Sequence, residues 1–61
     1  LSERELEVLN LITQGYSNRE IAEQLVVGLS TVKKHINHIY GKLNVTSRTR
    51  AIVRAGQLNL V

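Results

Sequence analysis

Residues 18–37 read NREIAEQLVVGLSTVKKHIN, and this stretch predicts two helices joined by a turn of about four residues. Apolar residues recur at helical spacing on both sides of the turn: Ile21, Ala22 and Leu25 before it, Val32 and Ile36 after it. Two helices that cross at about 90–120° must approach closely, and the small Ala22 permits this approach. The stretch is therefore predicted to be a helix-turn-helix.

Helix signals continue on either side of this motif. Ser2 with Glu5 and Ser17 with Glu20 have the spacing of capping boxes, which open a first and a second helix. Gly15 supplies the left-handed residue that commonly ends a helix. A third helix is expected over residues 29–43, with one apolar sector: Val32, Ile36, Ile39 and Leu43. Ser47 can cap a fourth helix, from residue 48 to about residue 58. The predicted fold is one all-α domain of four helices over residues 1–61.

Composition restricts what such a domain can do. A chain of 61 residues buries only about 60% of its unfolded surface, which leaves little room for a deep catalytic cleft. There is no Cys or Asp, and no nucleophilic triad or carboxylate pair, so an enzyme is not expected. His35 and His38 lack a third nearby ligand, so we expect neither a metal nor a cofactor. No apolar run approaches the roughly 20 residues of a membrane span. Because the chain starts at Leu1, we expect it to be part of a longer protein.

Charge is distributed unevenly along the chain. Residues 1–30 hold all five acidic residues and two arginines, for a net charge of −3. Residues 31–61 hold six basic residues and no acid, for a net charge of +6. A one-sided basic half is typical of proteins that bind a polyanion, although charge alone does not separate DNA from RNA or an anionic membrane. The third helix needs its apolar face for the core, which argues against a membrane-surface helix.

Four spaced motifs closely resemble the LuxR-type DNA-binding domain, a family that includes the effector domains of NarL/FixJ response regulators. They are LSERELEVL at residues 1–9, GYSNREIA at 15–22, TVKKH at 31–35, and KLNV at 42–45 followed by Arg48 and Ala51. The resemblance covers essentially the whole chain. It implies the carboxyl-terminal effector domain of a bacterial transcription regulator, in the cytoplasm at the nucleoid. Its partners would be double-stranded DNA, a second copy of the chain and RNA polymerase.

The resemblance also implies roles for single residues. The helix over residues 29–43 would be the recognition helix, and base contacts would come from Lys33, Lys34 and Asn37. Phosphate contacts would come from Ser17, Asn18, Arg19, Thr31, His35 and Lys42. Gly28 departs from the family pattern, which usually has Ser or Thr there, so the third helix is expected to lack a side-chain cap.

The fourth helix has a second apolar stripe. Its inner face is predicted to be Ala51, Ile52, Ala55 and Leu58, whereas Val53 and Leu60 fall on another side at a spacing of seven. A partner related by a two-fold axis would cover such a stripe, and the resemblance also implies dimerisation through this helix. The alternative function is a helix-turn-helix kept as a protein-binding adaptor or dimerisation module. That reading predicts acidic or apolar residues on the outer face of the third helix, where this chain has lysines.

Overall fold

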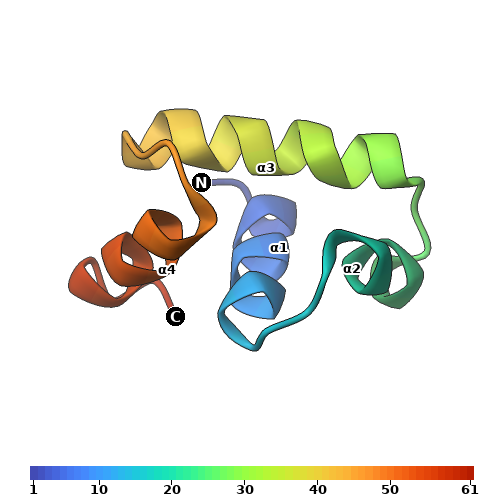
Figure 1. The fold of residues 1–61 in the computed structure, drawn as a ribbon, viewed down its shortest axis with the longest axis horizontal. Helices are drawn as coiled ribbons and strands as arrows, with labels where there is room; N and C mark the ends of the chain where they lie inside the picture. The colour runs from blue at the N-terminus through green and yellow to red at the C-terminus, as the bar shows by residue number, and fades with distance from the viewer.

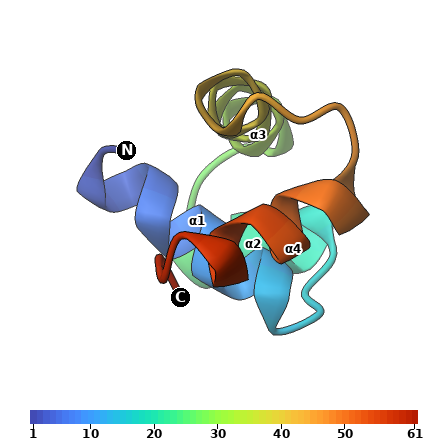
Figure 2. The same ribbon diagram turned by 90° about the vertical axis from the view of Figure 1, so that its left-hand side faces the viewer.

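The computed structural model describes all 61 residues and contains four helices and no strand, as the sequence predicts. Their bounds are α1 Glu3–Thr13, α2 Asn18–Leu25, α3 Leu29–Leu43 and α4 Arg48–Gln57. The longest helix, α3, lies across one side of the domain, and α1, α2 and α4 form the layer beneath it (Figures 1 and 2). In this arrangement α1 lies under the middle of α3, with α2 and α4 on either side. No helix has the length and unbroken apolar character that crossing a lipid bilayer requires.

Local hydrogen bonds explain where the helices begin and end. Both predicted capping boxes are present: the Ser2 hydroxyl accepts from the Glu5 N–H at 3.1 Å, and the Ser17 hydroxyl accepts from the Glu20 N–H at the same distance. The Ser47 hydroxyl accepts from the backbone of α4 in the same way. Gly15 has a φ of 92°, in the left-handed region that glycine tolerates best, and it follows the end of α1 as predicted. The helices α1, α2 and α4 therefore each start at a serine whose hydroxyl satisfies an otherwise unpaired N–H group.

The core is aliphatic and draws on every helix. Its buried members are Val8, Leu9 and Ile12 of α1, Ile21 and Ala22 of α2, Val32, Ile36, Ile39 and Leu43 of α3, and Ala51 and Ala55 of α4. The predicted apolar sector of α3 is thus confirmed in full, because all four of its residues are buried. With this sector facing the core, the opposite side of α3 faces outward.

The turn between α2 and α3 contains a residue in an unexpected conformation. Val26 has a φ of 56° and is 89% exposed, so a β-branched residue occupies the left-handed region. Gly28 has ordinary extended backbone and caps α3, with no side-chain hydrogen bond. The turn is held by Val27, which packs against the core and donates its N–H to the Ala22 carbonyl at 3.0 Å. Val26 is thus the left-handed residue that ends α2, and its conformation lets Val27 make this bond and pack against the core.

The faces of α4 differ from the prediction. Ala51 and Ala55 are fully buried, but Ile52 and Leu58 are exposed rather than turned inward. The helix ends at Gln57, and Asn59 has a φ of 56°, so Leu60 folds back and packs against the core instead of continuing a helical stripe with Val53. The physical reason is close approach. Two small alanines bring the backbone of α4 so near to α1 and α3 that bulkier residues on its flanks remain outside.

Candidate nucleic-acid interface

The outer face of α3 carries positive charge that the domain itself does not use. Lys33, Lys34 and Asn37 are all exposed, and none of them forms a side-chain hydrogen bond or an ion pair within the protein. Because an α-helix rises 1.5 Å per residue, the Cα atoms of Lys33 and Asn37 are separated by about 6 Å along the axis. These side chains thus form one compact donor surface on the helix.

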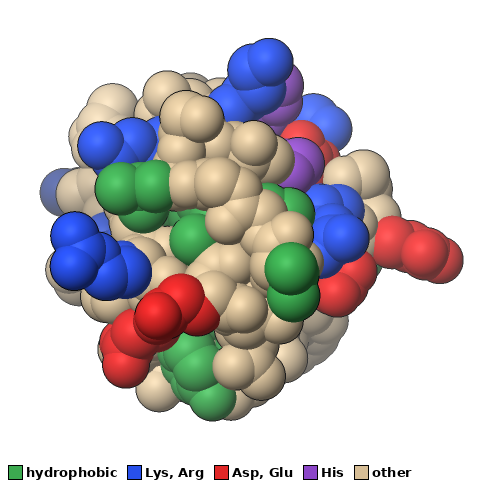
Figure 3. All heavy atoms as spheres, turned by 90° about the vertical axis from the view of Figure 1, so that its right-hand side faces the viewer, with side chains coloured by type: hydrophobic (Ala, Val, Ile, Leu, Met, Phe, Trp, Pro, Cys, Tyr) green, Lys and Arg blue, Asp and Glu red, His purple; other side chains and the backbone are tan.

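The outer side of α3 is rich in positive charge. Figure 3 views the domain from the side where α2 meets the start of α3, and it shows basic and His side chains along the upper edge and further basic side chains on both flanks. The Glu side chains lie mainly below this edge. Since α3 contains no acidic residue, its outer face presents no negatively charged side chain.

The start of α3 places two further predicted residues beside this surface. Thr31 is exposed in the first turn of the helix, and His35 is partly buried one turn later. Gly28 leaves the helix start without a side-chain cap, as predicted, and its carbonyl accepts from the Thr31 N–H at 3.1 Å. A Cβ atom added at Gly28 would come no closer than 3.9 Å to the Ser30 hydroxyl, so a side chain fits there.

The start of α2 presents unpaired backbone donors. Ser17 and Glu20 satisfy each other's N–H groups, with the Ser17 N–H donating to Glu20 Oε1 at 2.8 Å. These bonds hold the pKa of the Glu20 carboxyl below its usual range, so this group is ionised. The N–H groups of Asn18 and Arg19 have no acceptor in the protein. Ser17 and Arg19 are exposed and Asn18 is partly buried, so the predicted phosphate contacts of α2 share one helix end.

Arg48, the first residue of α4, is partly buried and does not extend freely into solvent. Its guanidinium instead donates to two groups at the start of α2: Nη1 to the Asn18 Oδ1 at 2.7 Å and Nη2 to the Tyr16 carbonyl at 2.6 Å. These partners lie 30 and 32 positions away in the sequence, so no local pattern could have identified them.

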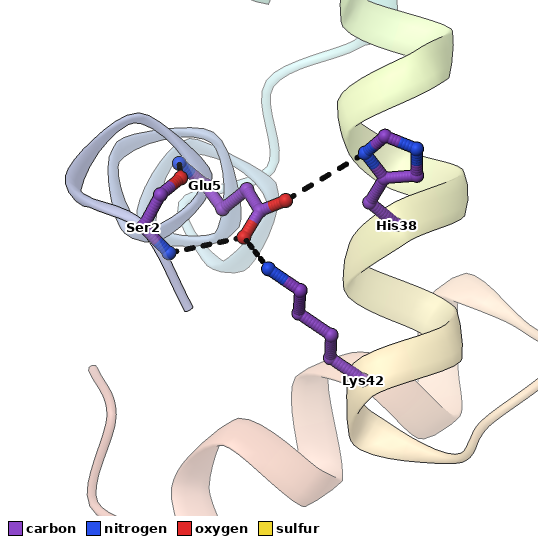
Figure 4. Close-up of polar contacts among 4 residues, drawn as sticks. All are labelled: Ser2, Glu5, His38 and Lys42. Atoms are coloured by element: carbon purple, nitrogen blue, oxygen red, sulfur yellow. Dashed lines mark hydrogen bonds and ion pairs between the residues drawn. The ribbon is translucent and has the colours of Figure 1, made fainter.

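Lys42 is held by a buried carboxylate. Glu5 of α1 is 4% exposed, and its Oε1 accepts a hydrogen bond from Lys42 Nζ at 2.7 Å and another from the Ser2 N–H at 3.0 Å (Figure 4). His38 Nδ1 lies 3.8 Å from Glu5 Oε2 on the same side of α3. The bond from Lys42, reinforced by the bond from Ser2, lowers the pKa of Glu5 from 4.5 to about 2. The structure therefore places Lys42, a predicted phosphate contact, in an ion pair that joins α1 to α3.

The exposed side of α4 forms a separate surface. Val53 is 55% exposed and lines an open groove at the end of α3 together with Asn44, Val45, Thr49, Arg50, Arg54 and Gln57. Leu60, the other residue predicted for a dimer interface, is partly buried against the core and does not line this groove. No group of three or more His, Cys, Asp or Glu residues is arranged to hold a metal ion.

Comparison with known proteins identifies the family. The family described as "Bacterial regulatory proteins, luxR family" matches residues 1–55 of this chain. The response regulator protein VraR of Staphylococcus aureus (strain NCTC 8325 / PS 47) is 49% identical over 61 residues, which is all of this chain and 29% of that protein. VraR of Staphylococcus epidermidis (strain ATCC 35984 / DSM 28319 / BCRC 17069 / CCUG 31568 / BM 3577 / RP62A) gives the same identity and coverage.

A solved structure agrees with these matches. The crystal structure of the response regulator ChrA in a heme-sensing two-component system superposes with a TM-score of 0.97 and 49% identity, over all of this chain and 30% of that one. The chain thus spans under a third of the length of the relatives it matches. Its four-helix fold and its sequence lead to the same assignment. The chain belongs to the luxR family of bacterial regulatory proteins and is a DNA-binding regulatory domain of that family, not an enzyme.

Proposed function

We propose that this domain binds double-stranded DNA sequence-specifically, with α3 in the major groove, and that it is the effector part of a longer bacterial transcription regulator. The observation that carries the proposal is the outer face of α3, where Lys33, Lys34 and Asn37 are exposed and have no partner in the protein. A helix with its side chains is about 10–12 Å wide, and the major groove is about 12 Å wide. The regulator would act in the bacterial cytoplasm at the nucleoid.

Base recognition is assigned to the three exposed residues of α3. The ammonium groups of Lys33 and Lys34 can donate to the O6 and N7 acceptors of guanine. The carboxamide of Asn37 can bond the N6 and N7 positions of adenine, because it offers one acceptor and a donor side by side. These contacts carry sequence information, whereas contacts to phosphates set register and affinity.

Phosphate contacts are assigned to the residues that surround this face. Ser17, Asn18 and Arg19 contribute from the start of α2, where backbone N–H groups also face outward, and Thr31 and His35 contribute from α3. Lys42 keeps two N–H donors beyond its bond to Glu5, and its side chain is 53% exposed, so it can reach a phosphate with the ion pair intact.

Matched variants separate base contacts from phosphate contacts. A preferred duplex is first selected from a random DNA pool, and binding is then titrated at two salt concentrations on that duplex and on single-base variants. Lys33→Ala is expected to reduce discrimination at one base pair by roughly 5- to 150-fold. Arg19→Ala is expected to weaken binding to every sequence and to lower the salt slope by about 1. Arg19 is preferred over Lys42 for this test because removing Lys42 would also leave the buried Glu5 without its partner.

Each outcome has a clear meaning. If wild-type protein shows no base preference, or Lys33→Ala keeps the wild-type preference, α3 does not read the duplex as proposed. If Arg19→Ala changes which base is chosen, the division between base and phosphate contacts is wrong. Binding to a protein in place of DNA would favour the adaptor function.

A homodimer on two half-sites is the second part of the proposal. Two half-sites about one helical turn of DNA apart, roughly 10 base pairs, match a protein dimer with two-fold symmetry. The exposed Val53 on α4 is the apolar residue that supports this dimer contact. Leu60 is partly buried against the core, so only its remaining exposed part is free to join the contact. Arg50 and Arg54 line the same groove, so a two-fold contact brings like charges together, and dimerisation is expected to be weak without DNA.

Analytical ultracentrifugation on a duplex with both half-sites tests the dimer. Val53→Asp is expected to reduce occupancy of the second half-site while leaving single-site affinity unchanged. Val61→Asp, at another half-exposed valine outside the helices, is the matched control and is expected to assemble as wild type. Unchanged dimer occupancy in Val53→Asp would refute an interface on α4. We also propose RNA polymerase as a partner of the full regulator, which co-sedimentation on the selected duplex would test.

A further inference from the structure

Arg48 joins two helices that do not pack against each other. It is the first residue of α4, and its guanidinium reaches the start of α2, where it donates to Asn18 Oδ1 at 2.7 Å and to the Tyr16 carbonyl at 2.6 Å. No Cα atom of α2 lies within 8 Å of a Cα atom of α4, so the two helices are not closely packed. The contact therefore connects the start of α4 to the amino-terminal end of α2, which faces DNA in the proposed complex.

The two hydrogen bonds fix the backbone that enters α2. The peptide between Tyr16 and Ser17 is held on both sides, because its carbonyl accepts from Arg48 and its N–H donates to Glu20 Oε1 at 2.8 Å. The next two N–H groups, those of Asn18 and Arg19, have no acceptor in the protein. Fixing the entering peptide thus fixes the direction in which these two donors point.

Arg48 also sets the orientation of the Asn18 carboxamide. A guanidinium has only donors, so the carboxamide must turn its oxygen toward Arg48 and its nitrogen away from it. Without Arg48 the carboxamide could rotate and present its oxygen to a phosphate, which would repel it. Arg48 consequently makes Asn18 a donor on its outward side.

The charge of Arg48 acts in the same direction. The ionised carboxylate of Glu20 belongs to the capping box at this helix start, and it repels a phosphate placed nearby. The guanidinium of Arg48, bonded to the adjacent Tyr16 carbonyl and Asn18 side chain, offsets that negative charge. The helix start then has a cation near its carboxylate, and a cation favours the approach of a phosphate.

We propose that Arg48 is a positioning residue for DNA binding, which acts through Asn18 and the entry to α2 and does not itself contact DNA. This inference rests on the proposed function, because the ligand that Asn18 meets is a DNA phosphate. A positioning role for Arg48 differs from a direct phosphate contact in one measurable respect. Removal of Arg48 and removal of the Asn18 side chain should have overlapping effects on affinity, since both remove the same contact.

A double-mutant cycle tests this inference. Arg48→Lys keeps the positive charge but loses the planar fork that holds two acceptors at once. The variants Arg48→Lys, Asn18→Ala and the double variant are titrated onto the selected duplex by fluorescence anisotropy, and circular dichroism gives the folded fraction at the same temperature. Arg4→Lys, the same substitution at an exposed arginine of α1, is the matched control. Two-dimensional NMR of the Asn18 side-chain amide protons reports the orientation of the carboxamide.

Each single variant is expected to bind DNA about tenfold more weakly than wild type, because each loses about one charge-assisted hydrogen bond. The double variant is expected to bind no more weakly than the single variant that has the lower affinity. Arg4→Lys should bind as wild type, and the Asn18 amide resonances should shift in Arg48→Lys. Wild-type affinity in Arg48→Lys, or fold-changes that multiply in the double variant, would overturn the role of Arg48. Absence of salt-dependent duplex binding by wild type would instead refute the proposed function.

Discussion

Replacing Val26 with asparagine is expected to make the domain more stable. Val26 lies in the turn between α2 and α3 with a φ of 56°, where a β-branched side chain crowds its own backbone. Asparagine adopts this left-handed conformation more readily, because its short polar side chain can bond locally. The backbone of the turn is held by the burial of Val27, so the substitution relieves strain without changing the path of the chain.

The expected gain follows from two opposing effects. The left-handed region costs an ordinary residue about 1–2 kcal/mol, and asparagine avoids most of this cost. Val26 is 89% exposed, so only about a tenth of the 1.5–3 kcal/mol of a fully buried valine is lost with its side chain. The net gain in the free energy of unfolding is about 1 kcal/mol. In a domain of this size that corresponds to a rise in Tm of about 4–8 °C.

Thermal and urea unfolding followed by circular dichroism measure this gain. Val61→Asn, at a half-exposed valine outside the helices and outside the left-handed positions, is the control and should leave Tm unchanged. DNA affinity of Val26→Asn should match wild type, because the placement of α3 is preserved. An equal or lower Tm in Val26→Asn would refute the view that the turn holds a strained valine.

Three further predictions concern stability. Gly28→Ser should raise the free energy of unfolding by about 0.5–1 kcal/mol in urea titrations, because the site has room for a side chain, α3 gains a cap and the unfolded chain loses freedom. Ala22→Leu should lower it by about 1–3 kcal/mol, since Ala22 is 8% exposed at the contact of α2 with α3; an unchanged midpoint would show that this contact is loose. Glu5, with its folded-state pKa lowered to about 2, should add stability above pH 4.5 and lose it as the pH falls toward 2. Glu5→Gln should flatten stability over that window, and an NMR titration of the Glu5 carboxyl that gives a midpoint near 4.5 would contradict the ion pair with Lys42.

Local patterns predicted most of the fold. The bounds of α3 follow from the helical spacing of its apolar residues and from the turn residues on either side. The capping boxes of α1 and α2 each lie within four consecutive residues. The same helical period places Lys33, Lys34 and Asn37 away from the apolar sector and therefore predicts that they are exposed. Such features depend on neighbours within one or two helical turns, which is the range over which sequence patterns carry structural information.

Features set by distant contacts were not predictable in this way. Glu5 reads as part of a capping box, but its burial and its bond to Lys42 depend on α3, 37 positions later. Of the four residues predicted for the inner face of α4, Ala51 and Ala55 are buried, but Ile52 and Leu58 are exposed, because the close approach of the helices leaves room only for small side chains. Arg48 shows the same limit, because its partners come from the start of α2. The assignments to bases, phosphates and a dimer interface remain predictions that DNA binding must test.

The most direct test of the central proposal is NMR of the domain bound to its selected duplex. Intermolecular NOEs should connect the side chains of Lys33 and Asn37 to protons that line the major groove, such as thymine methyl groups and cytosine H5. They should be absent from minor-groove sugar protons. NOEs to the DNA that arise from α4 or α1 and leave the outer face of α3 untouched would contradict the account.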